Sequence, residues 1–391
     1  MKIVFFAHPT FLNHQSMPRF AKMLAEGMEA RHHEVEIWSP QEYFHKIPLK
    51  ENIKKWMGYI DQYLIFPVQV RRKKRALPRE TLFVFTDHAL GPWVKLVADK
   101  PHVVHCHDFL AQRSALNEIK ENRTSWTGRQ YQALIRKGYS TGKNFISVSE
   151  KTKQDLDKFI KVNPKRSEVV YNGLNQQFSP QDADNARKLM SKKLKFQLDD
   201  GYILHVGGNQ WYKNRVGVIE IYNAWRETFG AALPLLLVGQ APSSELEKVF
   251  EASPFKNDIH FIKNAPDDVV KLAYCGASVF LFPSLAEGFG WPIAEAMASG
   301  CPVITTSEAP MTEVAGKAAF YIPRRPTEGD KVKEWAFKAA AVLQRLLALQ
   351  PADRKKMIKK GVDNAKRFDK GIALDNIEQI YTEILDSYKK L

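Results

Sequence analysis

The stretch from residue 282 to residue 306, FPSLAEGFGWPIAEAMASGCPVITT, predicts a strand, a glycine-containing turn, a short helix and a second strand. Its first residues complete an apolar run, SVFLFPS, that is typical of a buried strand. Gly288 and Gly290 let the backbone approach a ligand, Pro292 suits a first helical turn, and Gly300 ends the helix. Such a turn presents backbone N–H groups and the positive end of a helix dipole, and therefore favours a phosphate site.

Two carboxylates in this stretch, Glu287 and Glu295, lie eight positions apart. Glu287 precedes the predicted helix and Glu295 falls on its second turn, so both can face one pocket. We expect one carboxylate to face a sugar ring and the other a ribose diol. In another context Glu295 would be read as a carboxylate on a solvated helix face.

Buried apolar runs alternate with amphipathic segments along the chain, which is typical of parallel sheets covered on both faces. A first series closes near Val170 and a second starts at Tyr202, so the polar segment 173–200 holds the predicted domain boundary. From about Lys331 onward the pattern is helical, with no further strand. The expected strands lie in KIVFFAH, EVEIWSP, TLFVFTD, HVVHCHD, FISVS, SEVVYNG, YILHVGG, PLLLVGQ, DIHFIK, SVFLFPS and PVITT.

The composition of the 391 residues, 44% hydrophobic and 26% charged, excludes wholesale disorder and fits two or three domains. Three cysteines make no disulfide framework, which favours a reducing compartment. No apolar run is long enough for a spanning helix, and the start, MKIVFFAHPT, lacks the pattern of a secretory signal. We therefore expect a cytoplasmic protein.

The net charge of +15 is concentrated in the first half of the chain. Residues 1–180 carry 29 basic and 17 acidic side chains, whereas the remainder carries 29 and 26. Segment 50–79 interleaves aromatic and basic residues, as an element on an anionic bilayer does. A helix covering the domain core with a solvated basic tail would have a similar sequence. No nucleic-acid-binding module accompanies the charge, so we expect no nucleic-acid partner.

The segment EGFGWPIAEAMASGCPVI resembles the Glu-x7-Glu signature of the retaining glycosyltransferase family four. Other stretches resemble that family in the same order: VVHCHDFL, FISVSEKTKQDL, VVYNGLNQQFSP, ILHVGGNQWYKNR and AKRFDKGIALDNIEQIYTEIL. The resemblance implies an α/β, GT-B fold with two doubly wound Rossmann-like domains facing a cleft. The acceptor-binding domain would span 1–175 and the nucleotide-sugar-binding domain 200–365. A C-terminal helix, 370–391, would cross back and pack on the first domain.

The resemblance also implies roles for single residues. The residues with implied catalytic roles are Glu287 on the donor sugar hydroxyls, Lys213 as the phosphate lysine and His107 near the transferred sugar. Those expected to bind the donor are Glu295 on the ribose, with Gly288, Phe289, Gly290, Asn209, Arg215 and Asn264. Those expected on the acceptor side are Asn13, Ser16 and Asp108.

The chain departs from the family pattern in two places. The loop after the first strand, HPTFLNHQSMPR, contains no glycine, so side chains such as Asn13 and Ser16 would have to take its place. Gly208 stands where the family commonly has a phosphate-binding arginine, and Arg215 is our candidate substitute.

The reaction implied is a metal-independent transfer of a sugar from a nucleotide-diphosphate sugar to an acceptor hydroxyl, with retention of anomeric configuration. The leaving phosphate would help take the acceptor's proton, and no cofactor would be needed. The basic first half favours a lipid-linked or otherwise anionic glycan acceptor at the cytoplasmic face of the membrane, as in polysaccharide or glycolipid assembly. Positive potential from Lys213 and from the helix after Gly290 would stabilise the departing diphosphate.

Several alternatives stay open at this point. The chain could be a catalytically inactive GT-B-like nucleotide-binding or membrane adaptor protein, or a GT-B epimerase or phosphorylase. His107 could be a satisfied histidine at a strand end, and Lys213 a solvated loop lysine. His105 with His107 makes only a weak zinc pair, and Asp182 with Asp184 is interpreted as the acidic start of a helix, so no metal site is expected.

Overall fold

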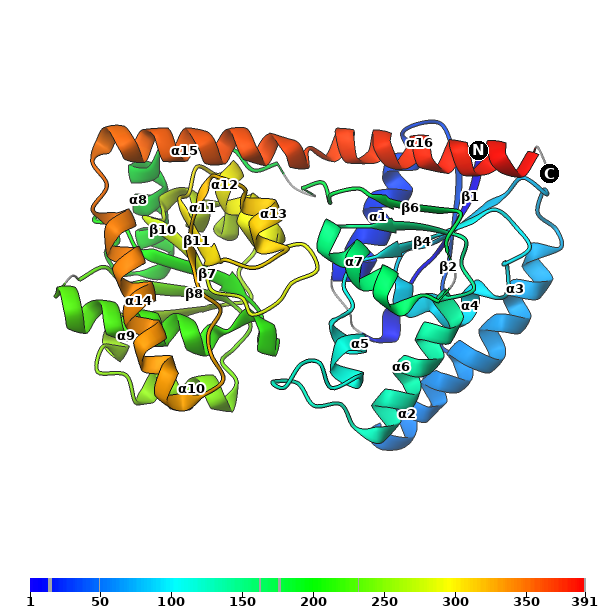
Figure 1. The fold of residues 1–391 in the computed structure, drawn as a ribbon, viewed down its shortest axis with the longest axis horizontal. Helices are drawn as coiled ribbons and strands as arrows, with labels where there is room; N and C mark the ends of the chain where they lie inside the picture. The colour runs from blue at the N-terminus through cyan, green and yellow to red at the C-terminus, as the bar shows by residue number, and fades with distance from the viewer. Residues whose placement is uncertain (13–15, 49, 162, 175–176, 231, 390–391) are drawn as a thin grey trace. The chain divides into compact units, whose positions relative to one another are not determined.

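The computed structural model describes residues 1–12, 16–48, 50–161, 163–174, 177–230 and 232–389. The chain forms two compact units, each of which is described by itself (Figure 1). Unit 1 comprises Met1–Gly173 together with Lys370–Leu391, and unit 2 comprises Leu174–Asp369. The polar segment that follows residue 173 therefore belongs to unit 2.

Unit 1 is built on a six-stranded parallel sheet with the order β2-β1-β3-β4-β5-β6. The first strand pairs with the third in the register Ile3 to Leu82, and the third pairs with the fourth in the register Val84 to Val103. Both faces of the central strands are buried, as their continuous apolar runs predict. The strands are β1 (Lys2–Phe6), β2 (Glu34–Trp38), β3 (Leu82–Phe85), β4 (His102–Cys106), β5 (Asn144–Ser147) and β6 (Arg166–Val169).

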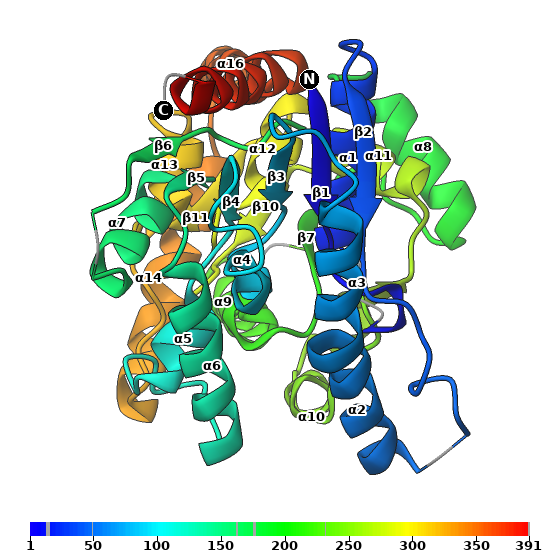
Figure 2. The same cartoon turned by 90° about the vertical axis from the view of Figure 1, so that its right-hand side faces the viewer.

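Helices cover both faces of this sheet (Figure 2). In α1 the side chains of Phe20, Leu24 and Met28 recur every four residues and are fully buried, so the predicted apolar face packs into the core. The helical elements of unit 1 are η1 (Thr10–Leu12), α1 (Ser16–Glu29), α2 (Glu51–Ile60), η2 (Asp61–Ile65), α3 (Phe66–Lys74), η3 (His88–Leu90), α4 (Gly91–Val94), α5 (Leu110–Ala115), α6 (Trp126–Tyr139), α7 (Glu150–Phe159) and α16 (Lys370–Lys389).

The aromatic and basic segment 50–79 forms a helical run in which a π-helical turn, η2, joins α2 to α3. Phe66 and Val70 are buried in the core of unit 1, whereas Leu64 and Val68 face solvent. The buried Asp61 in the π turn accepts backbone N–H groups from residues 43 to 45 at 2.9 to 3.2 Å. The segment therefore covers the domain core on one side and leaves an apolar stripe exposed on the other.

Two glycines allow close contact between the backbones of α4 and α6. A Cβ atom on Gly138 would lie 2.3 Å from the carbonyl oxygen of Gly91, and one on Gly91 would lie 2.5 Å from the carbonyl oxygen of Ile135. Neither position can take a side chain without a shift of backbone, because both clashes are with backbone atoms. This contact fixes the position of η3 and α4, which follow the third strand.

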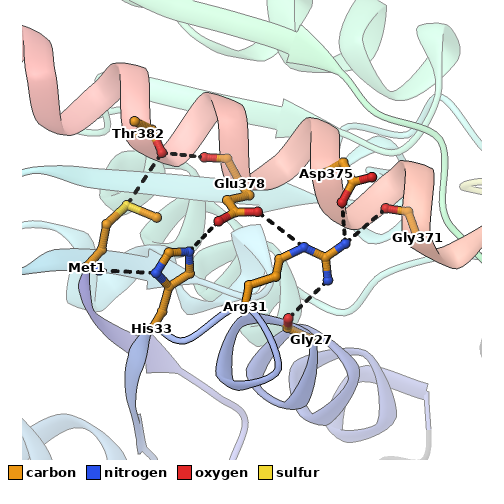
Figure 3. A network of polar contacts seen from close by, with 8 residues as sticks. All are labelled: Met1, Gly27, Arg31, His33, Gly371, Asp375, Glu378 and Thr382. Carbon is orange, nitrogen blue, oxygen red and sulfur yellow. Dashed lines mark hydrogen bonds and ion pairs between the residues drawn. The ribbon is translucent and has the colours of Figure 1, made fainter.

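A polar network holds the C-terminal helix α16 against the rest of unit 1, close to the amino ends of β1 and β2 (Figure 3). Arg31 forms an ion pair with Asp375 and lies 3.2 Å from Glu378 through Nε. His33 Nε2 lies 2.6 Å from the other oxygen of Glu378. On its buried side the helix contributes Leu374, Ile377, Tyr381 and Ile384 to the core.

Unit 2 contains a second six-stranded parallel sheet, with the order β12-β11-β10-β7-β8-β9. The strand β12 was not expected from the sequence: its run is short and only Ile322 within it is fully buried, so the apolar signal is weak. It pairs with β11 at the sheet edge. The strands are β7 (Ile203–Gly207), β8 (Leu235–Gly239), β9 (Ile259–Lys263), β10 (Val279–Phe282), β11 (Val303–Thr306) and β12 (Ala319–Ile322).

The helices of unit 2 begin at side-chain caps where the sequence provides them. Asp182 accepts the backbone N–H of Asn185 and starts α8, which confirms that Asp182 and Asp184 open a helix. The helical elements are α8 (Ala183–Leu194), η4 (Trp211–Lys213), α9 (Arg215–Phe229), α10 (Ser244–Glu251), η5 (Lys256–Asp258), α11 (Asp267–Gly276), α12 (Trp291–Ala298), α13 (Met311–Ala315), α14 (Gly329–Leu347), α15 (Pro351–Ala365) and η6 (Lys366–Phe368).

Strand order reverses once in each sheet. In unit 1 the reversal falls between β1 and β3, and in unit 2 it falls between β7 and β10. At such a switch point the loops after the two strands turn to opposite faces and leave a crevice at the carboxyl ends. These two positions are therefore where ligand-binding residues are expected in each unit.

Candidate active site

The loops that follow β7 and β10 are joined at the switch point of unit 2. The backbone N–H of Leu285 donates to the carbonyl oxygen of Tyr212 at 2.7 Å. The Nδ2 of Asn214 donates to the carbonyl oxygen of Pro283 at 2.9 Å, while Oδ1 of the same residue caps α9. Because both loops are fixed to one another, the side chains at residues 213 and 287 are held close together.

Lys213 and Glu287 form an ion pair across this junction. The Nζ of Lys213 lies 2.8 and 3.0 Å from the two carboxylate oxygens of Glu287, and Ser284 donates its hydroxyl to Oε1 at 2.8 Å. The side chains of Lys213 and Glu287 are only 14% and 8% exposed. The ammonium group also lies 5.1 Å from the centre of the Phe282 ring. Low exposure weakens screening by water and strengthens the attraction.

The helix after the glycine turn begins as the sequence predicts. Gly290 is its N-cap, with a φ of 105°, a conformation that a side chain would strain. Pro292 lies in the first turn, where its missing N–H removes no helical hydrogen bond. Phe289 is buried and packs edge-to-face on Phe368 at 5.3 Å. The N-terminus of α12 thus follows directly on the loop that carries Glu287 and Gly288.

Glu295 lies on α12 and has a different partner from Glu287. Its Oε2 accepts the hydroxyl of Tyr274 at 3.0 Å. Burial, followed by the neighbouring Glu295 carboxylate, raises the pKa of Tyr274 well above its usual value, so the hydroxyl stays protonated and donates. The carboxylate of Glu295 is therefore tied to α11.

Asn209 and Arg215 form a second polar cluster at the carboxyl end of β7. The Nη1 of Arg215 donates to Oδ1 of Asn209 at 2.6 Å and to the carbonyl oxygen of Gln240 at 3.0 Å. Arg215 is 5% exposed, and its Nε and Nη2 have no hydrogen-bond acceptor among the described residues. Burial lowers the pKa of Arg215 to about 10, so it remains a cation at neutral pH.

The remaining donor-side prediction, Asn264, follows β9. It has a φ of 50°, and its backbone N–H donates to the carbonyl oxygen of Gly239 at 2.9 Å. Asn264 is exposed. Its contacts therefore fix the backbone at the carboxyl end of β9 and leave its side chain at the surface.

The acceptor-side predictions lie in unit 1. His107 follows β4, is buried, and donates from Nε2 to the carbonyl oxygen of Thr86 at 2.9 Å. Burial lowers the pKa of His107, with Asp87 opposing the shift, so the ring is neutral. Asp108 accepts the backbone N–H of Leu110 at the start of α5. Asn13 lies outside the described residues, and of Ser16 the structure describes only its place at the first position of α1.

Three residues at these two carboxyl edges were not singled out from the sequence: Ser284 beside Glu287, and His8 with Asp87 in unit 1. The Nε2 of His8 lies 2.8 Å from Oδ2 of Asp87. Burial alone would raise the pKa of Asp87, but His88 and His8 hold it well below its usual value. Each of the three residues ends a predicted strand run, so the rule that ligand sites lie at the carboxyl ends of parallel strands could have found them, whereas His107 was predicted from the family resemblance.

Metal ligands do not cluster in the described ranges: there, no group of three or more His, Cys, Asp and Glu side chains has an arrangement that could hold an ion.

Two family models together match most of the chain. The model described as Glycosyltransferase Family 4 matches residues 17–178, and the model described as Glycosyl transferases group 1 matches residues 186–361. The chain belongs to glycosyltransferase family 4. As a family 4 member it has the expected GT-B fold class, and the Glu287 to Glu295 stretch lies inside the second matched region.

Individual relatives of this family 4 chain are distant. It is 24% identical over 266 residues to O-antigen chain mannosyltransferase B of Escherichia coli, a match that covers 67% of this chain and 65% of the relative. It is 25% identical over 183 residues to lipopolysaccharide glucosyltransferase WaaG of Escherichia coli, covering 46% and 48%. The chain thus spans less than two thirds of these curated relatives. Sucrose-phosphate synthase from Thermosynechococcus elongatus has a similar fold, with a TM-score of 0.75 at 16% identity over 99% of this chain and 100% of that one.

We predict strong energetic coupling between Lys213 and Glu287. In a double-mutant cycle with Lys213→Met and Glu287→Gln, urea unfolding should give a coupling free energy above about 1.5 kcal/mol, because each single change leaves a poorly solvated partner without its counter-charge. The control cycle uses Lys338 and Glu334, an ion pair of the same unit whose side chains are 65% and 66% exposed and which should show no measurable coupling. Equal coupling in the two cycles would contradict the site described here.

Proposed function

We propose that this chain is a retaining, metal-independent glycosyltransferase. It moves a hexosyl group from a nucleotide-diphosphate sugar to a hydroxyl of a lipid-linked or otherwise anionic glycan at the cytoplasmic face of a membrane. The observation that carries the proposal is the buried Lys213–Glu287 pair at the switch point of unit 2. It places a cation and a sugar-binding carboxylate beside the N-terminus of α12.

The chemistry needs positive potential where the leaving group departs. When the anomeric bond to the diphosphate breaks, negative charge grows on the phosphate oxygens. Lys213, at low exposure, and the positive end of the α12 dipole supply fixed positive charge, which is the arrangement that stabilises such a charge most. Glu287 then turns from its partner Lys213 to the hydroxyl groups of the sugar, so both members of the ion pair gain new partners at once.

Arg215 can supply the phosphate-binding cation that the family commonly has at the position of Gly208 in this chain. A buried cation with two unsatisfied donors is costly, and a phosphate oxygen would satisfy them. Arg215 starts α9 directly after the loop of Lys213, so the two cations belong to one turn of the chain. We therefore assign Arg215 to the donor phosphates, with Asn209 holding the guanidinium.

An exposed apolar stripe in unit 1 supports contact with a membrane. Trp56, Leu64 and Val68 on the α2–η2–α3 run are 63%, 63% and 62% exposed. The run ends in the exposed basic residues Arg71, Arg72 and Lys73. Aromatic and aliphatic side chains bordered by cations fit the interface of an anionic bilayer.

The helix α6 extends this surface. Tyr131 of α6 shares a hydrogen bond of 2.8 Å with Tyr63, so side chains of α6 and of the α2–η2–α3 run are in contact. Trp126 at the start of α6 is 72% exposed. Among the described helices, none is both long and apolar enough to cross a membrane. The names of two relatives, which refer to O-antigen chains and to lipopolysaccharide, agree with a lipid-linked acceptor.

The transferase proposal predicts that one nucleotide-sugar from a panel including GDP-mannose and UDP-glucose raises the melting temperature and is turned over in the presence of EDTA. Glu287→Gln should bind the corresponding nucleotide but lose at least about 100-fold in turnover, because the Glu287 carboxylate that binds the sugar hydroxyl groups is gone. Glu334→Gln, an exposed carboxylate of unit 2, is the control and should keep full activity. Stabilisation by a nucleotide without transfer or hydrolysis would favour the inactive adaptor instead.

The membrane proposal predicts that the protein sediments with vesicles containing phosphatidylglycerol and much less with vesicles of phosphatidylcholine alone. The double change Trp56→Ser and Leu64→Ser should weaken the binding at least about 10-fold, because it removes exposed apolar area that enters the interface. Leu189→Ser removes an exposed leucine of unit 2 and should leave binding unchanged. Equal sedimentation of the double variant and the wild type would contradict this proposal.

A further inference from the structure

Tyr274 is a buried tyrosine of α11 whose hydroxyl contacts the carboxylate of Glu295 on α12. The hydroxyl donates to Oε2 of Glu295 at 3.0 Å. Tyr274 is 0% exposed, whereas Glu295 is partly exposed. The hydrogen bond therefore joins a group inside the core of unit 2 to a carboxylate that a ligand can reach.

Aromatic packing fixes the ring of Tyr274. Its centre lies 5.3 Å from that of Phe280 on β10 and 6.0 Å from that of Phe178, with interplanar angles of 73° and 79°. Both are edge-to-face contacts, which favour one orientation of the ring. A phenylalanine would make the same ring contacts. What the hydroxyl adds at this position is the hydrogen bond to Glu295.

That hydrogen bond restricts the carboxylate of Glu295. The last torsion of a glutamate side chain has broad minima, so rotamer preference alone does not set the plane of its carboxylate. A donor on a ring that is itself fixed by packing holds one carboxylate oxygen in place. A carboxylate ordered in this way before binding gives up less conformational freedom when hydroxyl groups of a ligand bind to it.

The position of Glu295 on α12 indicates which part of a nucleotide-diphosphate sugar it meets. In the proposed function the sugar lies at Glu287 and the diphosphate at the N-terminus of α12. Glu295 lies five residues beyond the N-cap, Gly290, and therefore about 7 Å further along the helix. The ribose is attached to the diphosphate on the side away from the sugar, so it is the part of the ligand that extends toward Glu295.

We propose that Tyr274 is a positioning residue that holds the Glu295 carboxylate toward the ribose diol, so that the site selects ribonucleoside diphosphates over their 2′-deoxy analogues. This inference rests on the proposed function and deepens it. A ribose hydroxyl donates to the carboxylate, and an analogue without that hydroxyl leaves a desolvated acceptor unpaired. Sites built to bind a hydroxyl group discriminate strongly against such analogues.

The test measures dissociation constants by calorimetry for GDP and UDP and for their 2′-deoxy analogues, with the full chain. The wild type should bind the ribonucleotide that it prefers at least about 10-fold more tightly than the 2′-deoxy form. Tyr274→Phe should reduce this ratio at least about 3-fold, and Glu295→Ala should bring it close to 1. Adding Tyr274→Phe to Glu295→Ala should change the ratio no further, because the hydroxyl acts through the carboxylate.

Turnover gives a second readout of the same inference. With the nucleotide-sugar that the wild type uses, Tyr274→Phe should raise KM and keep kcat within a few-fold, because the ribose contact is the same before and during bond breaking. A merely structural hydroxyl would lower the melting temperature and leave the ratio of ribose to deoxyribose binding unchanged.

Tyr202→Phe is the matched control. Tyr202 is also 0% exposed and donates its hydroxyl to the carbonyl oxygen of Ala273, the residue before Tyr274 on α11, at 2.7 Å. This variant loses a buried hydrogen bond to the same helix and should keep the wild-type ratio.

Three results would overturn this inference and leave the proposed function standing. They are a wild-type ratio in Tyr274→Phe, an equal loss of the ratio in Tyr202→Phe, and a wild type that transfers sugar but binds the ribose and deoxyribose forms equally. A wild type that transfers no sugar from any nucleotide-sugar would overturn the proposed function, and this inference with it.

Discussion

Parallel strand order is the constraint on which both candidate sites depend. In each unit the first strand of the series has neighbours whose connecting helices cover opposite faces, and the loops after the two strands diverge at their carboxyl ends. Where these loops diverge, each unit has a basic side chain next to a carboxylate: Lys213 with Glu287 in unit 2, and His8 with Asp87 in unit 1. The same topological rule therefore places one polar pair in each unit, although the two pairs share no sequence pattern.

The two pairs differ in the partners that compensate their charges. In unit 2 the ammonium of Lys213 and the carboxylate of Glu287 neutralise each other, and each would exchange this partner for a group of the bound ligand. Removing one member of such a poorly exposed pair costs about 3–5 kcal/mol, because the remaining charge is left poorly solvated and without its partner. In unit 1 the carboxylate of Asp87 is 7% exposed and is in hydrogen-bonding contact with Nε2 of His8 and the backbone N–H of Ala89.

Most of the fold follows from apolar periodicity, because buried parallel strands leave continuous runs that are easy to recognise. The strand around Phe320 was missed since it is short, lies at a sheet edge and is only partly buried. Lys213 and Glu287 were each predicted as site residues from their motifs. Their direct pairing could not be predicted, because it depends on hydrogen bonds between two loops 74 residues apart in sequence. His8 and Asp87 carry no local pattern, and only the strand order brings them together.

A crystal structure of the protein with an intact nucleotide-diphosphate sugar tests this account most directly. In that complex the Nζ of Lys213 should leave Glu287 and lie within hydrogen-bonding distance of a diphosphate oxygen, while the Glu287 carboxylate accepts hydrogen bonds from hydroxyl groups of the sugar. A complex in which the nucleotide-sugar binds unit 2 but Lys213 and Glu287 remain paired to each other, with no contact to the ligand, would contradict it.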